Sequence, residues 1–124
     1  MLGQSRVYAS VAVNDIDRAK EFYGNTLGLE FVRENPGGVE YTSGGGNIFV
    51  YTSETAGTGE ATVAFWQVDD VKGTVEALLA KDIKFFEYDF PDGERDGYVH
   101  KMGPMEGAWF ADPDGNILGL GNDA

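Results

Sequence analysis

Hydrophobic and polar positions follow the same order twice along the chain. An alternating stretch, residues 6–13, precedes apolar positions at helical spacing, and the same pair returns at residues 61–68 and 71–79. The motif Val-Asn-Asp-Ile at 13–16 recurs 55 residues later as Val-Asp-Asp-Val at 68–71. Alternation predicts a strand and the helical period predicts a helix, so the chain is a tandem pair of similar units. Units too small to bury their own apolar faces pack together, and the groove between them is the expected place for a ligand.

Each unit continues with extended stretches separated by Gly- and Pro-rich turns. A segment rich in Gly and Asp, residues 91–97, is expected to form a loop. We therefore predict an α+β fold of two β-α-β-β-β modules in a single domain, residues 1–124, with the first module at about 1–56 and the second at about 57–124. The expected strands after the helices are residues 29–34, 39–43 and 47–53 in the first module and 83–88, 97–102, 108–111 and 117–120 in the second.

The helix ends are marked by capping and stop residues. Asn14 or Asp15 can cap the first helix, and Gly24 and Gly28 are expected to end it. The Asp pair at 69–70 is better explained as a helix cap than as a catalytic dyad.

The first strand has two different faces. Val7, Val11 and Val13 share one face, which we expect to pack against the helix. Tyr8 and Ser10 then point the other way, into the space shared by the two sheets. The offset of 55 residues makes Val63 and Phe65 their counterparts in the second module.

Composition narrows the function classes. The chain carries 21 acidic and 9 basic residues, a net charge of −12, and this argues against nucleic acid as a partner. Cys is absent, which excludes disulfides and thiolate sites. No apolar run is long enough to cross a membrane and the N-terminus has no signal-peptide pattern, so we expect a cytoplasmic protein.

Several residues have both a chemical and a structural explanation. His100, the one histidine, would be a general base or a hydrogen-bond donor if functional, and otherwise a solvent-facing or structural side chain; we expect His100→Gln to fold. Residues 112–116, Asp-Pro-Asp-Gly-Asn, are explained by turn chemistry rather than by metal binding. Trp66 and Trp109 fit core or interface positions as well as a ligand platform.

Four segments resemble the vicinal oxygen chelate superfamily, which contains glyoxalase I, extradiol dioxygenases, fosfomycin-resistance enzymes and bleomycin-resistance proteins. They are residues 13–23, 27–31, 68–71 and 109–117. The resemblance implies an open, barrel-like mixed sheet around a cavity, with the helices outside, and frequently a homodimer.

In metal-dependent members, side chains of the first and last strands of the modules hold one divalent ion. The resemblance places these positions at Tyr8, at Val63 or Thr62, near Phe49 or Val50, and at Gly119. Among these side chains only the phenol of Tyr8 could bind a metal ion, and only weakly. We therefore expect no metal and no cofactor.

These observations predict a metal-independent small-molecule-binding protein with a cationic or aromatic ligand in the sheet cavity. The alternative is a lyase, isomerase or dioxygenase-type enzyme in which His100, Tyr8, Tyr51 or nearby carboxylates do acid-base work or recruit a metal. A third possibility is a partner-binding domain acting through its dimer surface. The predicted ligand-binding residues are Tyr8, Ser10, Val50, Val63, Phe65, His100, Trp109 and Gly119.

Overall fold

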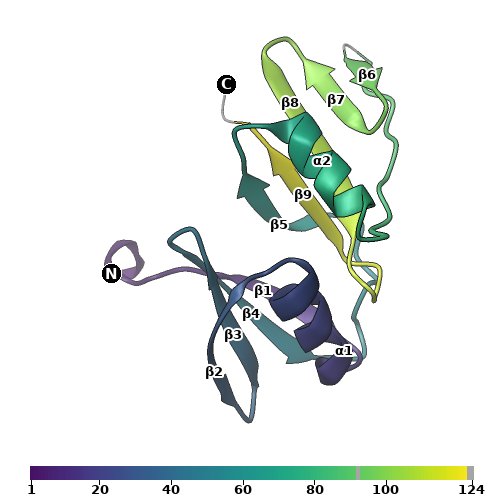
Figure 1. The fold of residues 1–124 in the computed structure, drawn as a ribbon. Coiled ribbons are helices and arrows are strands. Elements are labelled where there is room, and N and C mark those ends of the chain that lie inside the picture. The colour runs from purple at the N-terminus through teal and green to yellow at the C-terminus, as the bar shows by residue number, and fades with distance from the viewer. Residues whose placement is uncertain (92, 123–124) are drawn as a thin grey trace. The chain divides into compact units, whose positions relative to one another are not determined.

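A computed structural model describes residues 1–91 and 93–122 and shows an α+β fold (Figure 1). Its described residues form two mixed sheets, one of four strands and one of five, each with an α-helix. None of the helices among these residues is long and apolar enough to cross a membrane. The elements are β1 (Ala9–Val13), α1 (Ile16–Lys20), β2 (Glu30–Asn35), β3 (Gly38–Ser43), β4 (Gly46–Thr52), β5 (Thr62–Gln67), α2 (Val71–Leu79), β6 (Glu94–Asp96), β7 (Val99–Met102), β8 (Met105–Ala111) and β9 (Ile117–Gly121), with short helical segments at Leu2–Gln4 and Glu21–Thr26.

The chain divides into two compact units, each built around one sheet. The first contains Met1–Gly59 and Pro113–Asn116, and the second contains Glu60–Asp112 and Ile117–Ala124. The sequence placed the module boundary at 56/57. The turn at Pro113–Asn116 belongs to the first unit although it connects two strands of the second.

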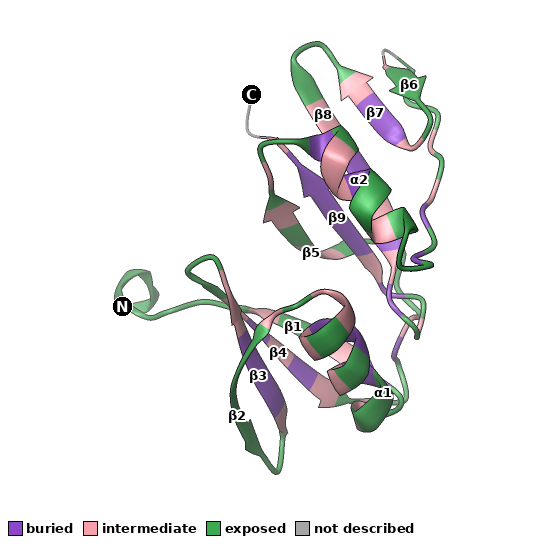
Figure 2. Cartoon of the chain, viewed as in Figure 1, coloured by how far each residue is buried: buried purple, intermediate pink, exposed green. Residues whose placement is uncertain are grey.

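The sheet of the first unit has the order β1-β4-β3-β2, with β1 parallel to β4 and the other neighbours antiparallel. Val11 and Val13 are fully buried, whereas Tyr8 and Ser10 are exposed. Within β1, the expected burial of Val11 and Val13 on one face and the exposure of Ser10 on the other are therefore confirmed. Val7 is an exception, because it precedes β1 and its side chain is 88% exposed. In Figure 2 the buried positions gather on β3 and β4, and β2 is exposed along its length.

The first helix begins at the expected cap but continues beyond its expected stop. The Asp15 carboxylate accepts hydrogen bonds from the backbone N–H groups of Asp17 and Arg18. After five residues α1 widens into a π-helical segment that contains Gly24, so this glycine does not end the helix. A Cβ on Gly24 would lie 3.5 Å from the Tyr41 ring, which explains a small residue there. Gly28, with φ of +75°, provides the left-handed residue that follows the helical segment.

The sheet of the second unit has the order β5-β9-β8-β7-β6, with β5 parallel to β9. The helix α2 lies against β7 and β8 and is capped by Asp70, whose side chain accepts from the Gly73 N–H. The structural explanation of the Asp pair at 69–70 is thus confirmed for Asp70. Buried apolar side chains from α2 and the strands form the core of this unit: Val71, Val75, Val99, Ala108, Phe110, Leu118 and Leu120.

The strand expected at residues 83–88 is wrong. This segment forms one bridge, between Phe85 and Phe110, while β7 pairs with the other half of β8. One half of the β8 edge therefore pairs with β7, and the other half contacts the segment around Phe85. Beyond the bridge the Tyr88 N–H donates to His100 Nε2, so it is not available for a strand partner. In the expected loop at 91–97, Glu94–Asp96 instead forms β6 and pairs with β7.

The turn at Pro113–Asn116 has the structural role that its sequence predicts. The Asn116 side chain accepts from the Gly57 N–H at 3.2 Å and donates to the Ala12 carbonyl at 2.7 Å. The Asp114 carboxylate pairs with Arg18 at 2.5 Å, and Gly115 has φ of +91°. These bonds attach the turn to β1 and to the connector between the two sheets.

Candidate functional site

Alternation along the strands of the second unit creates a face that α2 does not cover. Phe110, Leu118 and Leu120 are buried in the core, so their neighbours in sequence point to the opposite side. Strand register places the uncovered residues in rows across the sheet. The paired positions are Phe65 with Gly119, Trp109 with Gly119, and His100 with Gly107.

Glycines allow two large rings to lie against this sheet face. A Cβ on Gly119 would lie 2.7 Å from Phe65 Cδ2 and 3.1 Å from Trp109 Cδ1. A Cβ on Gly121 would lie 2.8 Å from Phe65 Cζ. The ring of Phe65 therefore occupies the space that side chains at both glycine positions would need. Phe65 itself is 55% exposed.

His100 stands at the centre of an aromatic cluster. Its ring centroid lies 5.2 Å from that of Trp109, 5.5 Å from that of Phe90 and 5.8 Å from that of Tyr88. The residue is 1% exposed, which excludes the solvent-facing alternative. These four side chains, Tyr88, Phe90, His100 and Trp109, are called the aromatic cluster below.

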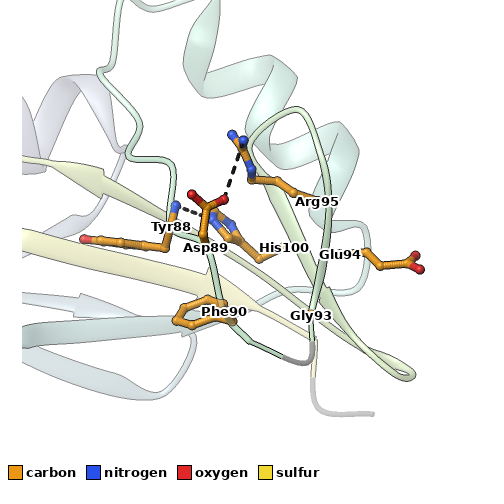
Figure 3. Close-up of a pocket in the computed structure, with 7 residues that line it drawn as sticks. All are labelled: Tyr88, Asp89, Phe90, Gly93, Glu94, Arg95 and His100. Carbon is orange, nitrogen blue, oxygen red and sulfur yellow. Dashed lines mark hydrogen bonds and ion pairs between the residues drawn. The ribbon is translucent and has the colours of Figure 1, made fainter.

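The two nitrogens of the His100 ring have different environments. Nε2 accepts a hydrogen bond of 2.8 Å from the Tyr88 N–H (Figure 3). An imidazole that accepts at one nitrogen carries its proton on the other, so Nδ1 is a donor. Nδ1 is buried and has no hydrogen-bond partner among the described residues. A buried donor without a partner is uncommon and marks a position where a ligand acceptor would be favourable.

A recess of about 180 Å³ opens beside His100. Figure 3 shows its lining, with Asp89 and Arg95 directed toward one another across it. Arg95 pairs with Glu87 and, at 3.9 Å, with Asp89. The hydrogen bond with Glu87 is the main cause that raises the pKa of Arg95 above its ordinary value. Glu94 also lines the recess, so the carboxylates of Glu87, Asp89 and Glu94 outnumber the Arg95 guanidinium in this part of the chain.

The structure brings together half of the residues predicted from sequence. Phe65, His100, Trp109 and Gly119 share the uncovered face of the second sheet. Val63 lies beside a register shift in β5 and is half-buried. The remaining predicted residues, all in the first unit, are Tyr8, Ser10 and Val50.

Within the first unit only two of these three lie on the uncovered side. Tyr8 and Ser10 are exposed, whereas Val50 is 1% exposed and pairs in register with Val11 and Val39 in the core. Its neighbours Phe49 and Tyr51 take the uncovered side instead. The sequence missed Tyr88 and Phe90, although aromatic residues at 86, 88 and 90 alternate and could have indicated a common face.

The residues that the resemblance places at the ion-binding positions do not fit a divalent ion. They are Tyr8, Val63 or Thr62, Phe49 or Val50, and Gly119, which offer one phenol and no imidazole or carboxylate. At Gly119 the rings of Phe65 and Trp109 fill the place of a side chain. Within the described part of the chain, no group of three or more His, Cys, Asp or Glu residues could hold a metal.

Solved structures with the same fold cover nearly the whole chain. A glyoxalase/bleomycin resistance protein from a Streptomyces species is 25% identical, with a TM-score of 0.62, 94% of this chain and 98% of that chain covered. The lactoylglutathione lyase of Agrobacterium tumefaciens is 18% identical, with a TM-score of 0.70 and coverages of 96% and 94%. A fosfomycin resistance protein of Listeria monocytogenes is 13% identical, with a TM-score of 0.73 and coverages of 98% and 94%.

A comparison with curated protein sequences finds no match. A sequence model of one superfamily matches residues 6–120, which cover most of both units. The chain therefore belongs to the Glyoxalase/Bleomycin resistance protein/Dioxygenase superfamily.

Proposed function

We propose that this protein binds a small molecule without a metal ion, on the uncovered face of the second sheet beside the aromatic cluster. One observation carries the proposal. Where metal-dependent relatives would carry a ligand at the last strand, Gly119 lies beneath the rings of Phe65 and Trp109. This face therefore offers aromatic surface at the position where metal chemistry would need a carboxylate.

The lining of the face favours a flat, positively charged ligand. Aromatic faces attract cations, and the carboxylates of Glu87, Asp89 and Glu94 outnumber the single guanidinium of Arg95. The Nδ1–H of His100 would supply one donor for an acceptor atom of the ligand. The net charge of −12 adds a long-range attraction for cations at low ionic strength.

The name of one related structure, a glyoxalase/bleomycin resistance protein, is compatible with binding as the whole function. Sequestration of a toxic small molecule needs a complementary site and no catalytic residue. In this proposal the protein sequesters its ligand in the cytoplasm and does so as a homodimer.

Proflavine, a planar aromatic cation, is the probe that tests this proposal. We expect metal-stripped protein to bind proflavine in a calorimetric titration, and the flat anion acridine-9-carboxylate to bind much more weakly. Trp109→Leu should weaken proflavine binding by about tenfold, because a ring–cation contact contributes about 1–2 kcal/mol.

Trp66→Leu is the matched control for this experiment. Trp66 lies beside the core residue Phe110, with ring centroids 6.2 Å apart. The same substitution there should change stability but leave the proflavine affinity of the folded protein unchanged. Equal losses of affinity in the two variants, or no binding of either dye by the wild type, would contradict the proposed site.

A further inference from the structure

A buried carboxylate lies in the first unit, far in sequence from the aromatic cluster. Glu40 is 3% exposed and occupies the middle of β3. Its neighbours Val39 and Tyr41 are buried on the side of α1, so alternation directs Glu40 to the uncovered side of this sheet. Register pairs it with Arg33 on β2 and with Phe49 on β4.

Three donors converge on this carboxylate. Asn47 Nδ2 donates to Oε2 at 2.7 Å, and Arg6 Nη2 donates to the same oxygen at 3.4 Å. Arg33 Nη2 lies 3.0 Å from Oε1. Glu40 thus holds two guanidinium groups on one sheet face, each through a single terminal nitrogen.

The two guanidinium groups keep most of their hydrogen-bonding capacity free. The side chains of Arg6 and Arg33 are 59% and 62% exposed, and within residues 1–91 and 93–122 Glu40 is the one acid paired with either. The first unit has two other basic residues, and each has an acid of its own: Arg18 pairs with Asp114 and Lys20 with Glu34. The Arg6–Arg33 pair therefore carries one uncompensated positive charge in a strongly acidic chain.

Aromatic rings continue from this positive charge along the same face. The Arg6 guanidinium lies 5.8 Å from the centroid of the Tyr8 ring. The Tyr8 and Phe49 centroids are 6.3 Å apart, and Phe49 stacks with Tyr51 at an interplanar angle of 13°. A planar anion with a ring attached would meet both features, since guanidinium groups bind carboxylates through paired N–H groups and aromatic rings accept a flat neighbour.

We propose that Arg6 and Arg33, positioned by Glu40, form a binding site for an aromatic carboxylate. The site uses residues of the first unit alone and does not depend on the function proposed for the second. Local charge decides the binding despite the net charge of −12, because exposed charges farther than about 8 Å are screened at physiological ionic strength.

An NMR titration with benzoate tests this site. Benzoate should shift the Nε–H signals of Arg6 and Arg33 and the backbone amides of β1 and β3. Arg33→Gln should weaken benzoate binding by about tenfold or more, because it removes a charge-assisted hydrogen bond. Lys20→Gln removes the same charge from the same unit and should change the affinity by less than about twofold.

Three outcomes would overturn the proposal. They are the absence of benzoate-induced shifts at Arg6 and Arg33, equal weakening by Arg33→Gln and Lys20→Gln in proteins of unchanged melting temperature, and tighter binding of phenyl phosphate than of benzoate. Cyclohexanecarboxylate, with the same charge and no aromatic ring, should bind more weakly than benzoate. Proflavine binding at the second unit is measured separately, so failure of either site can be recognised without the other.

Discussion

Replacing Gly57 with alanine should lower the free energy of unfolding by about 3–5 kcal/mol. Gly57 has φ of +70°, and a Cβ there would lie 1.8 Å from the carbonyl oxygen of Asp114. That oxygen belongs to the backbone of the turn that Asn116 attaches to Gly57 and Ala12. The clash therefore cannot be relieved by a side-chain rotation, and the turn must move. Urea denaturation followed by circular dichroism measures the loss.

Gly28→Ala separates the clash from the cost of the backbone conformation. Gly28 has φ of +75°, nearly that of Gly57, and a Cβ there would meet no described atom within 4 Å. We expect this variant to lose only about 1–2 kcal/mol, the cost of a left-handed residue with a Cβ. Equal losses in the two variants would show that the turn at Pro113–Asn116 is not held against Gly57 as described.

His100→Leu should lower the free energy of unfolding by about 2 kcal/mol more than His100→Gln. Leucine and glutamine have similar sizes, but only glutamine has an oxygen that can accept the hydrogen bond from the Tyr88 N–H. In the leucine variant that partly buried N–H would lose this partner. The two variants are compared by chemical denaturation at one pH.

The sign of this difference is informative. Hydrophobicity alone favours burying leucine over glutamine, so a more stable glutamine variant would show that the hydrogen bond to the Tyr88 N–H outweighs this advantage. A more stable leucine variant would contradict the expected contribution of that hydrogen bond. The expectation from sequence that His100→Gln folds is part of this comparison.

Local patterns predicted most of the fold. The repeated units, the caps at Asp15 and Asp70, and the opposite faces of Val11 and Tyr8 follow from spacing and side-chain chemistry that act within a few residues. The turn at Pro113–Asn116 was equally readable from its Pro, Asp and Gly residues. What the sequence could not show is that this turn, connecting two strands of the second sheet, binds Ala12 and Gly57 of the first unit.

The errors arise where distant residues compete for the same partner. Residues 83–88 have strand-forming side chains. However, β7 pairs with half of the β8 edge, and His100 accepts the hydrogen bond from the Tyr88 N–H, so these residues do not pair as a full strand. Val50 was expected among the ligand-binding residues but is buried in the core, whereas its neighbours lie on the uncovered face. A shift of one residue along a strand moves a side chain to the opposite face of the sheet. The aromatic cluster and the Glu40 site each combine residues from separate strands and loops, and a single sequence does not reveal such combinations.

The affinity of metal-stripped protein for proflavine, measured by calorimetry before and after addition of Mn(II), Fe(II), Ni(II) or Zn(II), tests the central claim most directly. We predict that proflavine binds once per chain with the same affinity in all cases, and that none of the ions binds stoichiometrically. Tight binding of one ion per chain, or proflavine binding that requires the ion, would contradict metal-independent binding and would direct enzymology to His100 and the carboxylates around it.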